Sequence, residues 1–249
     1  MLEGLRTVRG VLRSLRTYYG GGREKRAAMD RLYARFVSAG DLVFDVGSHV
    51  GDRVGAFRRL GARVVAIEPQ PALVRTLRLL YGRDPAVTIE AVAVGRSEGA
   101  IALKLNIDNP TVSTASDDFV QAAHGAPGWE GQAWIKSIRV HMTTLDRLIS
   151  RHGEPRFVKI DVEGLEADVL AGLSKPVAAL SFEFTTIQSE VARACIARCA
   201  ALGYRRFNAA LGESQTLVRE EWVTREGITA WLNALPQAAN SGDIYAVRP

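Results

Sequence analysis

The chain has 249 residues, of which 47% are hydrophobic and 24% are charged, and its formal net charge is +5. This length and composition allow a full hydrophobic core within one α/β domain. No apolar run approaches the roughly 18 residues that span a bilayer, and arginines interrupt the N-terminus where a signal peptide would be apolar. We therefore expect a soluble, cytoplasmic protein.

The excess positive charge lies at the N-terminus. Residues 1–26 contain seven basic and two acidic side chains, a balance of +5 that equals the net charge of the whole chain. The remaining residues are close to neutral and lack the basic footprint of a nucleic-acid-binding surface. We therefore do not expect a nucleic-acid partner.

The first 19 residues have the pattern of a basic amphipathic helix. Arginines alternate with apolar residues at helical spacing, namely Leu2, Leu5, Val8, Leu12, Leu15 and Tyr19. Two roles remain open for this helix: packing on its own domain, or peripheral contact with a membrane through residues 1–19. A second helix is predicted at about 24–38. Together these helices form a predicted N-terminal extension over 1–40, which precedes a main domain over 41–249.

Strands and helices alternate in the main domain. Strands are predicted at about 42–46, 63–67, 87–94, 101–105, 138–142, 156–161, 177–184, 204–209 and 243–247. Helices are predicted at about 52–60, 72–81, 144–151, 164–172 and 187–202. This alternation is typical of an α/β fold with a mostly parallel, doubly wound sheet.

Two segments depart from the alternation. The stretch at about 106–134 is rich in Asn, Pro, Ser, Thr, Gly and Asp. A segment of this length inside a compact domain is usually functional or mobile, so we interpret it as a lid or substrate loop, with a plain insertion as the alternative. The stretch at about 211–240 is interpreted as a helical insert. Both would shape the acceptor pocket.

The turn after the first strand carries the first sign of a ligand. Asp45, Gly47 and Gly51 have the spacing D-x-G-x-x-x-G directly after an apolar run. Glycine lets a ligand approach the backbone, and open α/β sheets bind ligands at the carboxyl ends of their strands. A dinucleotide site instead needs G-x-G-x-x-G against a pyrophosphate. An acid at this position favours a cofactor with a cationic amino-acid end, such as S-adenosylmethionine.

A second acid ends the next strand. Glu68 lies about 20 residues after the first glycine, where an acid can hold the ribose diol of either cofactor class. Asp45 and Glu68 together therefore predict a cofactor that contains a nucleoside.

An acidic cluster follows the strand at 156–161. The strand period of two places Lys159 and Asp161 on one side, and a buried lysine needs an acidic partner, for which Glu183 is the first candidate. Asp161 and Glu163 fall at the same sheet edge as Asp45. We predict that Lys159, Asp161, Glu163 and Glu183 act on the acceptor, with a carboxylate receiving its proton. A buried ion pair without a chemical role is the alternative.

No dedicated metal site is predicted. Cys195 and Cys199 fall one turn apart on a predicted helix and have no neighbouring His, which makes a poor metal site. A divalent ion that bridges the acids of the cluster at 159–163 is a minor alternative.

Five motifs resemble the FkbM family of S-adenosylmethionine-dependent methyltransferases. They are FDVGSHVG at 44–51, EPQP at 68–71, AVAVG at 91–95, TLD at 144–146 and KIDVEGLE at 159–166. The resemblance covers about residues 42–184. It implies a Rossmann-like class I methyltransferase fold with a sheet of about seven strands. It also implies O-methylation of a hydroxyl on a sugar, glycolipid, polyketide or similar small molecule.

The resemblance also assigns cofactor contacts. Asp45, Gly47 and Gly51 would line the methionine end of S-adenosylmethionine, and Glu68 its ribose. The other expected contacts are Ala93 and Val94 near the adenine, together with Ser48, His49, Pro69 and Asp161. The expected partner is a small-molecule or glycan acceptor. Two alternative functions remain open: a nicotinamide-dependent oxidoreductase, and a non-catalytic S-adenosylmethionine-binding scaffold.

Overall fold

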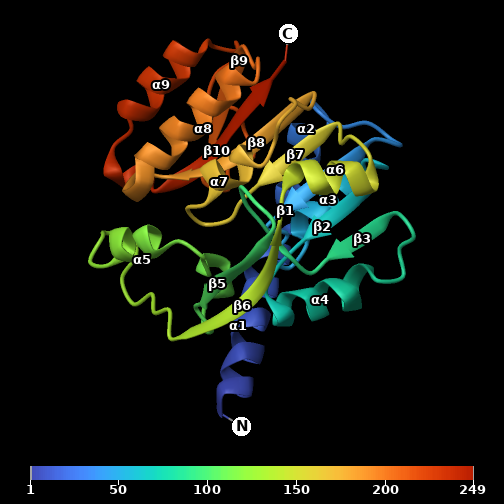
Figure 1. The fold of residues 1–249 in the computed structure, drawn as a ribbon, viewed down its shortest axis with the longest axis vertical. Coiled ribbons are helices and arrows are strands. Elements are labelled where there is room, and N and C mark those ends of the chain that lie inside the picture. Colours follow the sequence, from blue (N-terminus) through green and yellow to red (C-terminus); the bar gives the residue numbers. More distant parts are fainter. Residues whose placement is uncertain (1, 249) are drawn as a thin grey trace.

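A seven-stranded sheet forms the centre of the protein in a computed structural model that describes residues 2–248 (Figure 1). The strand order is β3-β2-β1-β7-β8-β10-β9. In chain order these strands are β1 (Leu42–Val46), β2 (Arg63–Ile67), β3 (Val87–Glu90), β7 (Phe157–Ile160), β8 (Ala179–Thr185), β9 (Arg206–Leu211) and β10 (Ser241–Val247). Neighbours pair in parallel, except that β10 is antiparallel to both β8 and β9. The predicted doubly wound class I methyltransferase fold is confirmed.

Helices cover both faces of this sheet. They are α2 (Gly22–Tyr33), α3 (Asp52–Arg59), α4 (Pro71–Tyr81), α6 (Leu145–His152), α7 (Glu166–Ala171), α8 (Ser189–Ala201) and α9 (Arg225–Asn233). Along β1, Phe44 faces a core shared with α6, α7 and α8, whereas Val43 faces a second core shared with α2 and α3. A strand that is buried on both faces consists mainly of apolar residues, and this burial explains why four of the five residues of β1 are apolar.

A second sheet has the order β4-β6-β5. Its strands are β4 (Ala93–Val94), β5 (Gly99–Leu105) and β6 (Lys136–Thr143). The prediction of one strand over 87–94 is therefore wrong. Val87–Glu90 pairs with β2, whereas Ala93 pairs with Met142 of β6, so the chain passes from one sheet to the other at residues 91–92.

The segment at 106–134 is folded. It contains η1 (Pro110–Val112) and α5 (Asp117–Ala123), and a small core of its own around Phe119 and Trp129. The Thr114 hydroxyl donates a hydrogen bond of 2.6 Å to the carbonyl oxygen of Glu163. This bond ties the segment to the turn after β7. In the stretch at 211–240, helix α9 is followed by η3 (Gln237–Ala239), while η2 (Thr186–Gln188) follows β8.

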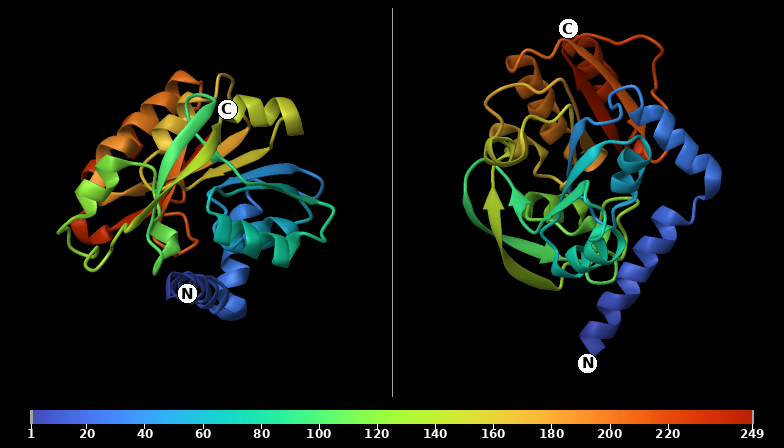
Figure 2. Two further views of the ribbon diagram at one scale, coloured as in Figure 1. Left: turned by 60° about the horizontal axis from the view of Figure 1, so that its bottom comes forward. Right: turned by 90° about the vertical axis from the view of Figure 1, so that its right-hand side faces the viewer.

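The N-terminal helix α1 (Leu2–Tyr19) projects from the body (Figures 1 and 2). Its later turns lie against η1 and α4. Among residues 2–248, no helix combines the length and the apolar content that crossing a bilayer requires. Met1 and Pro249, the outer ends of the two predicted regions, lie outside the described residues.

Candidate active site

A cleft lies at the carboxyl edge of β1, β2 and β7. The structure brings together here every predicted site residue except Gly51: Asp45, Gly47, Ser48, His49, Glu68, Pro69, Ala93, Val94, Lys159, Asp161, Glu163 and Glu183. Parallel neighbouring strands end at one edge, which is why motifs more than 100 residues apart meet.

The turn after β1 is pressed against the turn after β7. Gly47 has φ +82°, and a Cβ atom added there would lie 1.7 Å from the carbonyl oxygen of Asp161. The N–H groups of Gly47 and Ser48 both donate to the carbonyl oxygen of Ile67, at 2.9 and 3.0 Å. A side chain at position 47 would therefore force the two turns apart.

Gly51 is not among the residues that line the cleft, so the structure gives its expected cofactor contact no support. A Cβ atom at Gly51 would meet Leu77 and Tyr81, each at 2.7 Å, and the Tyr81 hydroxyl donates to the Gly51 carbonyl oxygen at 2.8 Å. Gly51 precedes α3 on the far side of the turn. It allows α3 to pack against α4.

Two buried carboxyl groups, those of Asp45 and Glu68, line the cleft. Asp45 is 1% exposed, and its Oδ2 atom has no hydrogen-bond partner among the described residues. Burial raises the pKa of Asp45 to about 6. Glu68 accepts hydrogen bonds from the N–H groups of His49 and Gln70, at 3.0 and 2.8 Å, and burial raises its pKa to about 8. Each carboxylate oxygen has two lone pairs, so both groups can accept further bonds from a ligand.

The charge of the lining favours a cationic ligand. Seven carboxyl groups line the cleft against two cationic side chains in the described part of the chain, Arg53 and Lys159. His49 adds no charge, because burial lowers its pKa to about 4. A pyrophosphate would be repelled here, whereas the sulfonium and ammonium groups of S-adenosylmethionine fit the unpartnered Asp45 oxygen. An apolar wall formed by Val92, Ala93, Val94, Ile101 and Leu103 fits the adenine.

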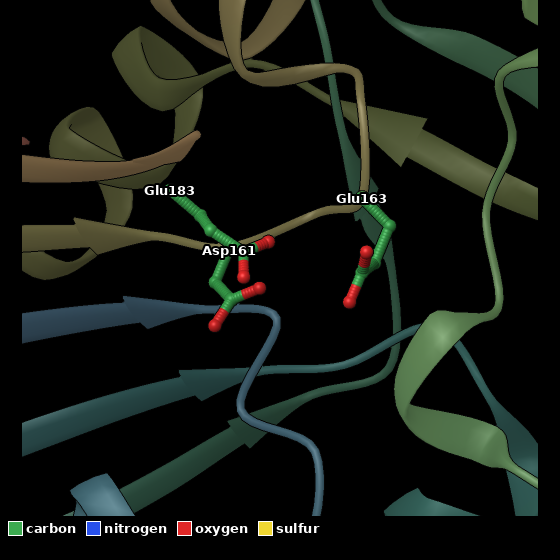
Figure 3. Close-up of side chains that lie close together, drawn as sticks. All are labelled: Asp161, Glu163 and Glu183. Carbon is green, nitrogen blue, oxygen red and sulfur yellow. The ribbon is translucent and has the colours of Figure 1, made fainter. Parts of the chain in front are cut away.

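The side chains of Asp161, Glu163 and Glu183, which all line the cleft, point toward one another (Figure 3). One carboxylate oxygen from each lies within 4.8 Å of the others. Asp161 follows β7, Glu163 lies in the turn beyond it at φ +57°, and Glu183 comes from β8. These oxygens are close enough to share one cation, which was the minor alternative above. The ammonium group of Lys159 already lies on one side of Asp161.

The three acids differ in ionisation. Burial, together with the Asp161 charge, raises the pKa values of Glu163 and Glu183 well above their ordinary range. Burial also opposes ionisation of Asp161, but Lys159 outweighs it and holds the pKa of Asp161 below its ordinary value. Glu163 is itself buried, with 6% of its surface exposed. The cluster thus combines an ionised carboxylate with carboxyl groups of raised proton affinity.

The predicted pairing of Lys159 with Glu183 is wrong. Lys159 Nζ lies 2.6 Å from Asp161 Oδ2 and 4.0 Å from Asp243 Oδ1. The register explains the difference, because β8 places Ser181 beside Lys159 and Glu183 two residues further along. Asp243, opposite Glu183 on β10, was not predicted, although an acid at the start of the apolar run 243–247 was a usable signal.

Several further lining residues were not predicted, among them Tyr18, Arg53, Thr111 and Glu213. The ring of Tyr18 lies edge-on to His49, with 5.0 Å between centroids, and Arg53 lies 5.7 Å from the centroid of the Tyr18 ring. Arg53 also forms an ion pair of 2.7 Å with Glu213. The N-terminal helix therefore contributes one wall of the cleft, a role that its sequence pattern does not indicate.

Burial of Glu68 predicts a loss of stability as the pH rises. Its pKa increases from 4.5 to about 8, so the folded protein keeps a proton that the unfolded chain releases. This stabilisation is fully present below pH 4.5 and is lost as the pH rises through the pKa of Glu68 in the folded protein. Between the two pKa values the free energy of unfolding falls by roughly 1.4 kcal/mol per pH unit. In denaturant titrations from about pH 5 to about pH 9, we expect wild type to lose more stability than Glu68→Gln. Equal losses would show that Glu68 is ionised in the folded protein.

The chain is similar to known methyltransferases. The family model described as the methyltransferase FkbM domain matches residues 45–235. No curated protein matches the chain in sequence. Three solved structures are distantly similar, and at these TM-scores the family match alone carries the assignment. One is a TehB-like SAM-dependent methyltransferase from Corynebacterium glutamicum, with a TM-score of 0.47 and 11% identity over 96% of this chain and 94% of that one. The second is precorrin-6y C5,15-methyltransferase from Geobacter metallireducens, with a TM-score of 0.44 and 12% identity over 92% of this chain and 90% of that one. The third is a SAM-dependent O-methyltransferase from Thermotoga maritima, with a TM-score of 0.43 and 11% identity over 91% of this chain and 65% of that one.

Proposed function

Because the chain belongs to the FkbM methyltransferase domain family and is a S-adenosylmethionine-dependent methyltransferase, we propose that it methylates a hydroxyl group of a sugar, glycolipid, polyketide or similar small molecule. The observation that supports this acceptor class is the buried carboxyl group of Glu163, which converges in the cleft with those of Asp161 and Glu183. A hydroxyl keeps its proton at neutral pH, so its methylation needs a nearby proton acceptor.

In this proposal the β1–β2 edge holds the cofactor. S-adenosylmethionine supplies an electrophilic methyl group on a sulfonium sulfur. Asp45 accepts hydrogen bonds from the cationic amino-acid end, and Glu68 accepts them from the ribose hydroxyls. Gly47 keeps this part of the cleft open, and Ala93 lies in the apolar wall for the adenine. Asp161, between the two halves of the site, contributes to both.

The acceptor end supplies a base and a means of orientation. Glu163 receives the proton of the acceptor hydroxyl when its own carboxyl group is ionised, and its raised proton affinity then favours the transfer. Lys159 keeps Asp161 ionised, so that Asp161 accepts a hydrogen bond and fixes the direction of the acceptor oxygen. Glu183 shares the proton with these groups. The segment at 106–134, which places Thr111 in the lining, is proposed as the lid over this end.

The two alternatives fit less well. A nicotinamide dinucleotide would place a pyrophosphate beside Asp45 and Glu68, in a cleft whose lining is mostly acidic. A non-catalytic scaffold would have no need of three carboxyl groups converging in the cleft, an arrangement that costs stability.

Transfer of a radiolabelled methyl group to a panel of glycans, glycolipids and polyketides tests the proposal. We expect label on at least one hydroxyl acceptor and none on the matched deoxy analogue that lacks this hydroxyl. An amine-bearing analogue of each acceptor serves as the second control. Preferential labelling of the amine would contradict O-methylation. Cofactor binding without transfer to any acceptor would favour the scaffold.

A further inference from the structure

One face of α1 exposes a row of apolar side chains. Leu5, Val8 and Leu12 are 54%, 55% and 58% exposed. Their spacing of three and four residues places them on one side of the helix. Single exposed apolar side chains are ordinary on a protein surface, but a row along a projecting helix marks a surface that contacts another body (Figure 2).

The opposite face of α1 is already used by the fold. Gly10 and Ser14 are buried, and a Cβ atom at Gly10 would lie 2.2 Å from the carbonyl oxygen of Ile107. Tyr18, two turns after Gly10, lines the cleft. The helix is therefore fixed on the body in one rotation, and the apolar row cannot turn inward.

Basic side chains flank the apolar row. At about 100° per residue, Arg9, Arg13 and Arg16 lie within roughly a quarter turn of it. All three are exposed. Within residues 2–248 the ion pairs of α1 are those of Glu3 with Lys136 and of Arg6 with Asp108, so none of the three arginines forms one. An apolar stripe beside free guanidinium groups is the pattern of a helix that lies in the interface of an anionic membrane.

We propose that this face of α1 docks on the surface of an anionic phospholipid bilayer. The apolar row enters the boundary between headgroups and acyl chains, and the three arginines contact lipid phosphates. The association is peripheral. Because Tyr18 of the same helix lines the cleft, docking brings the active site to the membrane. This consequence rests on the proposed function and favours a glycolipid among its acceptors.

Sedimentation with vesicles tests the docking separately from methyl transfer. We expect wild type to bind vesicles of equal parts phosphatidylserine and phosphatidylcholine at low salt, not to bind pure phosphatidylcholine, and to be released as salt screens the charges. Each arginine contributes roughly a factor of five, so the triple variant Arg9→Gln, Arg13→Gln and Arg16→Gln should bind on the order of 100-fold more weakly. The variant Leu5→Gln, Val8→Gln and Leu12→Gln should also lose binding.

Two matched variants serve as controls. Arg35→Gln, Arg156→Gln and Arg206→Gln remove the same charge from exposed arginines at the opposite edge of the sheet and should leave binding unchanged. Leu5→Met, Val8→Met and Leu12→Met keep the row apolar and should also bind. Methyl transfer to a water-soluble acceptor should be the same in all four variants, which separates failure of docking from failure of the proposed activity.

Three outcomes would overturn the docking. The first is that wild type does not sediment with anionic vesicles at low salt. The second is that both arginine triples weaken binding equally, which would show a general charge effect. The third is that the glutamine variant of the apolar row turns a dimer into a monomer in solution without changing vesicle binding. That result would assign the row to a contact between two copies of the chain.

Discussion

Replacing Lys159 with methionine should lower the free energy of unfolding at neutral pH by about 3–5 kcal/mol, because it removes one partner of a buried ion pair. The side chain of Lys159 is 2% exposed and lies 2.6 Å from Asp161 and 4.0 Å from Asp243. Asp243 is itself 8% exposed, and its Oδ1 atom has no hydrogen bond among the described residues. Without the ammonium group, both carboxylates lose the charge that compensates them.

Denaturant unfolding followed by circular dichroism measures this effect. Lys136→Met is the matched control, because Lys136 pairs with Glu3 at the surface, with side chains 43% and 58% exposed. That substitution should cost much less stability than Lys159→Met, because solvent screens the exposed pair. The double variant Lys159→Met, Asp161→Asn should recover part of the loss, because it removes one of the uncompensated charges. A cost for Lys159→Met no larger than that of the control would show that the cluster does not depend on the lysine.

The parallel part of the sheet and the cofactor edge could be predicted from local sequence. Each of β1, β2 and β7 is an apolar run that ends in an acid or a glycine, and parallel neighbours necessarily bring these ends to one edge. Asp45, Glu68 and Asp161 could therefore be placed in one cleft before any side chain was positioned. The spacing of two residues in β7 also put Lys159 and Asp161 on one side.

The remaining features of the site depend on long-range register and packing. The partner of Lys159 was mispredicted because the alignment of β7 with β8 decides between Ser181 and Glu183, and sequence alone does not fix that alignment. Asp243 comes close because β10 inserts antiparallel between β8 and β9, near the end of the chain. Tyr18 enters the cleft only because α1 packs back against η1.

Substitution of an acid at each end of the cleft should separate cofactor binding from catalysis. We expect Asp45→Asn to weaken S-adenosylmethionine binding by roughly tenfold to a hundredfold, because it removes a charged hydrogen-bond partner worth about 1.5–3 kcal/mol. Glu68→Gln should weaken binding in the same direction, because it replaces one acceptor oxygen facing the ribose diol with an amide N–H donor. We expect Glu163→Gln to lower kcat by about 10²–10⁴, because it removes the proton acceptor, with cofactor affinity little changed. Glu183→Gln should lower kcat in the same direction.

The most direct test of this division is to measure the S-adenosylmethionine Kd by calorimetry and kcat by methyl transfer for Glu163→Gln and Glu68→Gln, after circular dichroism shows that both are folded. The two substitutions are chemically identical and start from buried glutamates of one cleft. The predicted result is a large loss of kcat at nearly unchanged Kd for Glu163→Gln, and a raised Kd for Glu68→Gln. A loss of cofactor affinity in Glu163→Gln in proportion to its loss of rate would contradict the assignment of the acidic cluster to the acceptor.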